Sequence, residues 1–288
     1  MKTMKELFYF STRNDSLGLC LSGGGALGIA HIGVIQALEE NRIYPTHIAG
    51  SSMGAIVGTL YAAGYSPTDI MRMIKEDKLY KITKIMSFRP TLFKSGVSSH
   101  QLLRTLIKEL IPQNNFESLK KKMHICVSNL NTAEWEIMDT GGDLDKWVSA
   151  SASVPGVFET VKEGDVYYVD GGLMNNMPAQ AIKYCPNIIG VDVIPHRVPT
   201  ELNKPMDSLA FSLRAMAHYN SKAGRNLCRF IIEPQAIEKH NEFSFDAYEA
   251  IYQYGYDAAH KYISENPELL KLASVPQKWT KELHTKVS

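Results

Sequence analysis

Residues 19–34 read "LCLSGGGALGIAHIGV", and this stretch decides the fold. An apolar run ends at Ser22, three glycines follow, and apolar residues then recur at helical spacing. The pattern predicts a buried strand over residues 17–21, a tight glycine loop, and a helix over residues 27–40. Such a loop brings bare backbone N–H groups close to a negatively charged group. That group is either a nucleotide phosphate or the oxyanion of a reaction.

Strand and helix patterns alternate through most of the 288 residues. Further strands are expected at residues 46–49, 124–130, 134–139, 166–169, 188–193 and 228–232. Further helices are expected at residues 53–63, from residue 66, and at residues 99–110, 143–153, 205–226 and 245–263. This alternation predicts an α/β fold, a three-layer α/β/α sandwich with a largely parallel central sheet.

No repeat and no linker interrupts the alternation, so we expect a single domain over residues 1–288. Its core is expected at about residues 17–263, with a helical insertion or lid at residues 65–122 and a peripheral tail at residues 268–288. The apolar stretch Ile82–Phe93 either forms an acyl pocket, touches a membrane as a lid, or packs in the core.

Composition excludes several classes of protein. The net charge of +1 leaves no electrostatic footprint for nucleic acid, and the four cysteines lack metal-site spacing, so buried free thiols are expected. No window approaches 18 uninterrupted apolar residues, and the first 15 residues lack the apolar core of a signal peptide. We therefore expect a cytoplasmic protein, with transient contact at membrane surfaces as a further expectation; oligomeric state is left open.

The glycine loop satisfies the dinucleotide-binding pattern G-x-G-x-x-G at Gly23, Gly25 and Gly28. That function also needs an acidic residue at the end of the second strand, to hold the ribose hydroxyls. The second strand runs instead into "AGSSMGAIVG", which has no acid, and no GK[ST] follows the glycines. A phosphate-binding P-loop is excluded, and a nucleotide-dependent oxidoreductase stays only as an alternative.

Residues 50–54, "GSSMG", match the G-x-S-x-G pattern of a nucleophile elbow with Ser52 at its centre. Gly50 and Gly54 let strand and helix pass closely, while the serine hydroxyl is exposed at a helix N-terminus that stabilises negative charge. Both loops end strands at the same sheet edge and so face one crevice. The N–H groups of Gly24, Gly25 and Ala26 could then hold an oxyanion.

A serine nucleophile needs a base, and "YYVDGGLMNNMP" at residues 167–178 offers one. Asp170 ends a predicted strand, and Gly171 and Gly172 permit close approach of the backbone. The alternative is an ordinary Asp-Gly turn, with Asn175 and Asn176 as helix caps.

Histidine is the other candidate base. His196 follows a predicted strand, and His218 and His240 come later, so a conventional Ser–Asp–His triad is a further alternative. His31 follows the glycine loop at helical spacing and is expected to be structural.

The motifs "GGGALG", "GSSMG" and "DGG", in this order, resemble the patatin-like phospholipase family. The segments "SASVPGVFETV" and "VDGGLMNNMP" also resemble the family, so the resemblance covers about residues 17–262. It implies a patatin-like fold and a Ser–Asp dyad without histidine, with Ser52 as nucleophile and Asp170 as base. It implies no metal or cofactor. The implied oxyanion loop is Gly23, Gly24, Gly25, Ala26 and Gly28.

One residue departs from the family pattern. Leu27 stands where the family usually has Arg or Lys. Weaker oxyanion stabilisation, replacement by another cation, and a preference for neutral lipids are the three consequences left open.

The sequence thus predicts a serine ester hydrolase that cleaves acyl esters of lipids, of the phospholipase A, lysophospholipase or lipid acyl hydrolase type. The alternative from another class is a catalytically weak or silent lipid-binding protein.

Overall fold

The computed structural model describes residues 16–76, 99–194, 196, 203 and 205–273. Within these residues one eight-stranded sheet has the order β5-β6-β3-β2-β1-β7-β8, and β4 pairs separately with β3. The strands are β1 (Leu17–Leu21), β2 (His47–Gly50), β3 (Lys122–Asn129), β4 (Glu134–Met138), β5 (Val161–Glu163), β6 (Val166–Asp170), β7 (Asn187–Val191) and β8 (Phe230–Ile232).

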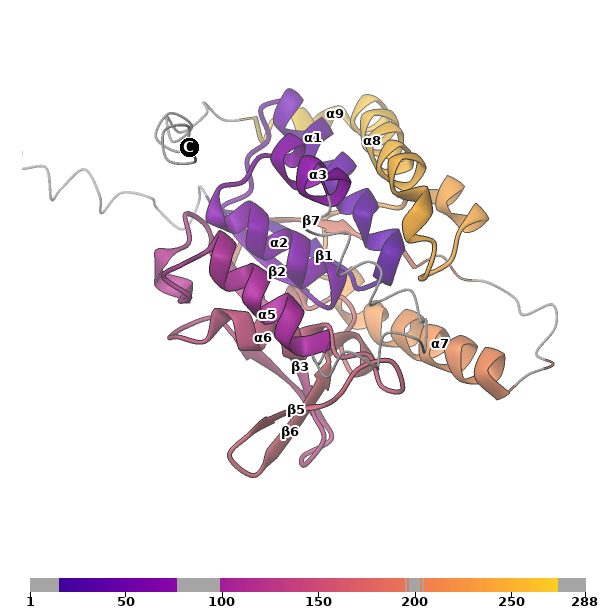
Figure 1. Cartoon of the computed structure of the whole chain (residues 1–288). Helices are drawn as coiled ribbons and strands as arrows, with labels where there is room; N and C mark the ends of the chain where they lie inside the picture. Colours follow the sequence, from indigo (N-terminus) through magenta and orange to yellow (C-terminus); the bar gives the residue numbers. More distant parts are fainter. Residues whose placement is uncertain (1–15, 77–98, 195, 197–202, 204, 274–288) are drawn as a thin grey trace, which may run out of the picture.

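The helices connect and cover these strands (Figure 1). The α-helices are α1 (Ala30–Glu40), α2 (Met53–Ala63), α3 (Pro67–Lys75), α5 (Ser99–Leu110), α6 (Leu144–Ser151), α7 (Pro205–Arg225), α8 (Tyr248–Glu265) and α9 (Pro267–Leu270). Short 3₁₀ helices are η1 (Gly25–Ile29), η3 (Phe116–Ser118), η4 (Gly171–Leu173), η5 (Ala179–Ile182), η6 (Gln235–Lys239) and η7 (Phe245–Ala247).

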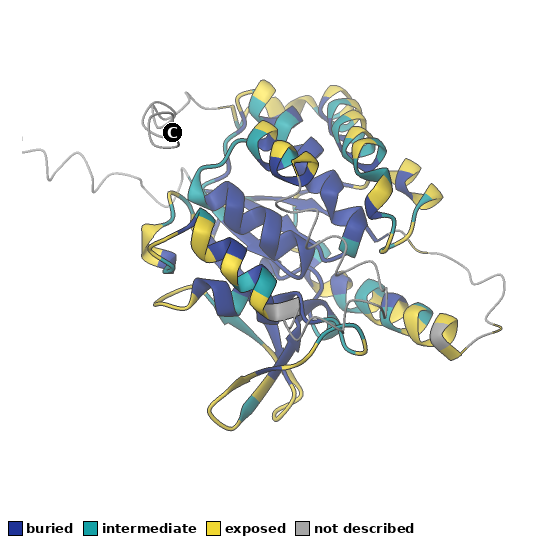
Figure 2. Ribbon diagram, viewed as in Figure 1, coloured by how far each residue is buried: buried dark blue, intermediate teal, exposed yellow. Residues whose placement is uncertain are grey.

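The parallel part of the sheet consists of β3, β2, β1, β7 and β8, whereas β4, β5 and β6 pair antiparallel. Side chains alternate across β1: Leu19 and Leu21 join the large core beneath α1, α2 and α8, and Cys20 joins a smaller core with η5 on the opposite face. The prediction of an α/β sandwich with a largely parallel sheet is confirmed. Figure 2 shows the sheet and the flanking helix faces as the buried part of the molecule.

Local signals placed several helices correctly. In α3 the Ser66 hydroxyl accepts the Asp69 N–H at 3.1 Å and the Asp69 carboxylate accepts the Ser66 N–H at 3.3 Å, a capping box, with Pro67 in the first turn. The helices predicted to begin at residues 27 and 245 instead begin as the 3₁₀ segments η1 and η7, and the short strand β5 was not predicted.

The predicted insertion contributes buried residues to the large core. α3 supplies Ile70 and Met73, and α5 supplies Leu103 and Ile107. The stretch Ile82–Phe93 lies outside the described residues, as does most of the predicted tail, so the domain boundaries stay a prediction.

Two further expectations concern composition. The four cysteines are free thiols, as predicted, and Cys20, Cys126 and Cys185 are buried. In the part of the chain that the structure describes, no helix combines the length and the apolar character needed to cross a bilayer.

Candidate active site

Two strands meet end to end at the centre of the site. β4 pairs with β3 from Ile125 to Asn129 and occupies one edge of that strand. β2, whose Gly50 is level with Ile125, and β6, whose Asp170 is level with Val127, therefore share the other edge. β2 runs parallel to β3 and β6 runs antiparallel, so their carboxyl ends face one another. This topology brings the loop after β2 to the last residue of β6.

Ser52 stands at the start of α2 in a strained backbone conformation, with φ 53° and ψ −124°. Its N–H donates to the Ser151 hydroxyl at 3.0 Å, and the residue is only 4% exposed. A Cβ on Gly54 would lie 2.4 Å from the carbonyl oxygen of Leu21, so α2 can approach β1 only with glycine there. The geometry is that of a nucleophile elbow, in which the serine stands between a strand and the N-terminus of a helix.

Asp170 is buried at the end of β6. Its Oδ1 accepts the Gly172 N–H at 2.8 Å, while Oδ2 makes no full hydrogen bond among the described residues. Burial raises the pKa of Asp170 to about 6, and the nearby Ser52 hydroxyl and the Gly172 N–H partly oppose this effect. A carboxylate with this pKa is ionised at neutral pH and is a stronger base than an exposed aspartate. Gly171 has no room for a Cβ, which would lie 2.3 Å from the carbonyl oxygen of Cys126.

The five residues predicted for the oxyanion loop have different surroundings. The N–H of Gly23 donates to Oδ1 of Asn176 at 3.0 Å, and the N–H of Ala26 donates to the Glu242 carbonyl at 2.9 Å. Gly28 packs against Met53 of α2 and does not line the cavity.

Gly24 and Gly25 differ from these three. Both residues line the cavity, as Gly23 also does, but their own N–H groups have no hydrogen-bond acceptor within the described ranges. Gly25 has φ 54°, and a Cβ there would lie 2.4 Å from the Glu242 carbonyl oxygen. Leu27 is fully buried in the large core, so it places no charge at the loop.

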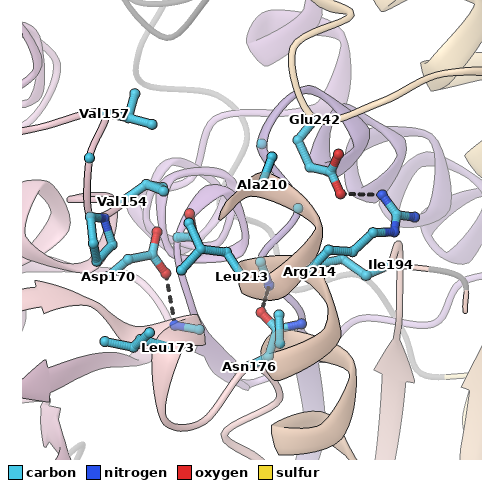
Figure 3. A pocket seen from close by; sticks show the side chains of 18 of the residues that line it. Val154, Val157, Asp170, Leu173, Asn176, Ile194, Ala210, Leu213, Arg214 and Glu242 are labelled. Carbon is cyan, nitrogen blue, oxygen red and sulfur yellow. Dashed lines mark hydrogen bonds and ion pairs between the residues drawn. The ribbon is translucent and has the colours of Figure 1, made fainter. Parts of the chain in front are cut away.

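A mainly apolar cavity of about 410 Å³ opens beside Ser52 and Asp170 (Figure 3). Its apolar walls include Val154, Pro155, Val157, Phe158, Leu173, Ile194, Leu209, Leu213, Ala217 and Phe243. The charged side chains on the wall, besides Asp170, are Arg214 and Glu242, which form an ion pair with each other. The cavity therefore suits an apolar chain that carries one reactive polar group.

None of the rival histidine bases lines this cavity. The His196 ring packs on the His218 ring at 5.1 Å between centroids, and the His240 ring packs on Tyr254 at 5.9 Å. His31 is fully buried and its Nε2–H donates to the Ser22 carbonyl at 2.8 Å. Burial lowers the pKa of His31 to about 4, which keeps the ring neutral, as expected for a structural residue. The geometry gives the triad alternative no support.

Four residues of the site were not predicted for it. The Ser151 hydroxyl accepts the Ser52 N–H and the Asn176 side chain accepts the Gly23 N–H; Asn176 was interpreted only as a cap. Arg214 and Glu242 come from the last third of the chain, where no motif marks them. Two of them carried a usable signal: Asn176 lies six residues after Asp170 in the same loop, and Ser151 begins the segment "SASVPGVFETV" that resembles the family. Across the described segments, no group of three His, Cys, Asp or Glu side chains has the arrangement of metal ligands.

Comparisons with known proteins identify a family for this chain. A family model described as "Patatin-like phospholipase" matches residues 19–182. The lysophospholipase NTE1 of Candida glabrata is 27% identical over 91% of this chain, and the uncharacterized NTE family protein Mb2594 of Mycobacterium bovis is 31% identical over 58% of it. The chain spans only 17% and 28% of the lengths of these two relatives.

Among solved structures, human GIVD cytosolic phospholipase A2 aligns with a TM-score of 0.49 and 10% identity, covering 91% of this chain and 60% of its own. VipD from Legionella pneumophila aligns with a TM-score of 0.48 and 16% identity, covering 94% of this chain and 73% of its own. The family model covers more than half of the chain and includes the glycine loop, the Ser52 elbow and Asp170. The chain therefore belongs to the patatin-like phospholipase family.

Proposed function

We propose that this protein is a serine hydrolase that cleaves acyl esters of lipids through a Ser52–Asp170 dyad. One observation carries the proposal: the buried Asp170 Oδ2 without a full hydrogen bond, next to the strained Ser52 at an apolar cavity. A buried acceptor without a partner costs stability, so its retention favours a role in proton transfer. The relatives named lysophospholipase make a lysophospholipid the first substrate class to test.

The proposed reaction has two halves. The Ser52 oxygen attacks the ester carbonyl carbon while Asp170 accepts the hydroxyl proton, and that proton then passes to the departing alcohol. Water next attacks the acyl-enzyme carbonyl carbon while Asp170 takes its proton; the bond to the Ser52 oxygen then breaks, the proton passes to that oxygen, and the fatty acid leaves. The N–H groups of Gly24 and Gly25 hold the oxyanion in both halves, and one such donor is worth about 10²–10³ in rate.

The cavity supplies the site for the acyl chain in this proposal. Leu209 and Phe243 line it and remain 43% and 40% exposed, so apolar side chains continue from the cavity wall to the surface. We expect transient contact with lipid aggregates at these residues while the acyl chain enters. The catalytically silent alternative requires a loop that cannot hold an oxyanion, and the available N–H groups of Gly24 and Gly25 argue against it.

The test is hydrolysis of a short-chain p-nitrophenyl ester and of lysophosphatidylcholine. Ser52→Ala and Asp170→Asn should each abolish turnover, whereas His196→Ala should leave it unchanged. Ser264→Ala and Asp165→Asn, at exposed positions, are the matched controls.

A fluorophosphonate probe should label wild type and not Ser52→Ala. Absence of labelling at Ser52 in folded wild type would favour the silent lipid-binding alternative. Loss of activity in folded His196→Ala would replace the dyad by a triad.

A further inference from the structure

The glycine loop is held from its outer side by Glu242. The Glu242 carbonyl accepts the Ala26 N–H at 2.9 Å. The same oxygen leaves no space for a Cβ at Gly25, which has the positive φ of 54°. Glu242 thus contacts Gly25 and Ala26, the two residues directly after Gly24.

Glu242 is itself held by Arg214 of α7. The Arg214 guanidinium binds Glu242 Oε1, and the arginine side chain is only 7% exposed (Figure 3). Glu242 lies between η6 and η7, in a segment that also forms local turn bonds, such as Phe243 N–H to Asn241 Oδ1 at 2.9 Å. The Arg214–Glu242 pair adds a charge-assisted bond from α7 to this segment.

The same helix also contacts the loop that carries the acid. The Asn220 side-chain amide donates to the Leu173 carbonyl, three residues after Asp170. α7 therefore binds the acid loop through Asn220 and the glycine loop through Arg214 and Glu242. A rigid helix that contacts both loops fixes their relative positions.

We propose that Arg214 is a positioning residue for the oxyanion donors, acting through Glu242 on Gly24 and Gly25. The proposal rests on the function proposed above. Leu27 is buried and apolar, so the charged pair next to the loop comes from outside it. A buried ion pair is retained at a cost in desolvation, which a simple apolar contact would avoid. A directional bond that sets backbone geometry gives a reason for retaining it.

The test uses Arg214→Met, Arg214→Lys and Glu242→Gln. Arg214→Met keeps the volume and removes the bond, so kcat should fall about 10²-fold, the effect of displacing a catalytic group by about 1 Å. KM should stay within about twofold, because the apolar wall that holds the acyl chain is unchanged. Arg214→Lys keeps the charge and one donor and should recover most of kcat, and Glu242→Gln should lie between the two.

Arg229→Met is the matched control. It removes a surface pair with Glu268, 2.7 Å long and about half exposed on both sides, and a bond to Asn187; none of these three residues lines the cavity. Its kcat should equal that of wild type. Hydrogen–deuterium exchange provides a readout that needs no turnover: the Ala26 amide should exchange faster in Arg214→Met than in wild type or Arg229→Met.

Three results would overturn the proposal. The first is an unchanged kcat in Arg214→Met. The second is a rise in KM for lysophosphatidylcholine alone, with kcat kept, which would make Arg214 a subsite for the phosphate. The third is unchanged exchange at Ala26. If wild type and Ser52→Ala hydrolyse esters equally, the proposed function fails by itself, and exchange at Ala26 still decides whether Arg214 holds the loop.

Discussion

Replacing the buried Asp170 by its neutral isostere asparagine should make the protein more stable and, if Asp170 is the base as proposed, inactive. In Asp170→Asn the amide oxygen still accepts the Gly172 N–H. The amide N–H₂ can donate a hydrogen bond to the Ser52 hydroxyl, which faces the carboxylate in wild type. The shape of the side chain and its hydrogen bonds are preserved, and only the buried charge is removed.

The magnitude follows from the pKa. Burial raises the pKa of Asp170 from 3.8 to about 6. Between pH 3.8 and about 6, Asp170 is protonated in the folded state and ionised in the unfolded state, so the free energy of unfolding of wild type falls as pH rises. The full loss, about 3 kcal/mol, is reached above pH 6. Asparagine does not ionise, so the free energy of unfolding of Asp170→Asn should be up to about 3 kcal/mol higher than that of wild type at pH 7–8 and nearly equal to it near pH 4.

The assay is urea denaturation of wild type, Asp170→Asn and the exposed control Asp165→Asn at several pH values from 4 to 8. The control should follow wild type at every pH. An Asp170→Asn protein less stable than wild type at pH 8, with the hydrogen bond to Gly172 intact, would show that the buried carboxylate is not strained and would refute the reasoning. Ester hydrolysis measured on the same samples should be absent in Asp170→Asn at every pH and present in wild type and Asp165→Asn at pH 7–8.

Three other results are expected. First, kcat/KM of wild type should be constant above about pH 7 and fall tenfold per pH unit below pH 6, because only the ionised form of Asp170 accepts the proton; a pH profile with its inflection near pH 4 would contradict the raised pKa. Second, Gly54→Ala should destabilise the fold by about 1–3 kcal/mol or more, because its Cβ would lie 2.4 Å from a backbone oxygen of β1, and it should also abolish ester hydrolysis. The control Gly142→Ala, whose Cβ meets no atom within 4 Å, should match wild type both in thermal unfolding and in ester hydrolysis. Third, burial lowers the pKa of His31 from 6.5 to about 4, so the neutral ring costs no stability above pH 6.5, and about 3 kcal/mol of the free energy of unfolding is lost as pH falls to 4. In urea denaturation, His31→Asn should lose less stability than wild type over this pH range. Equal losses in the two proteins would contradict the lowered pKa of His31.

The sequence determined by itself the features that depend on local interactions. Strand and helix periods, the glycines beside Ser52 and the capping box at Ser66 are encoded within a few residues of where they act, because backbone sterics and capping bonds are local. The α/β class and the helix that starts at Met53 were therefore predictable, as was the location of Ser52 at a strand-to-helix turn.

Only the tertiary structure decided how the parts of the site meet. Nothing in "YYVDGG" says that β6 runs antiparallel on the same edge of β3 as β2, yet this arrangement makes Asp170 face the Ser52 loop. The sequence of the glycine loop also does not indicate which of its N–H groups have hydrogen-bond acceptors in the folded protein. Asn176 and Glu242 occupy two of them from positions about 150 and 215 residues away. Such pairings depend on strand register and on packing over the whole chain, and neither can be inferred from the local periodicity of apolar residues.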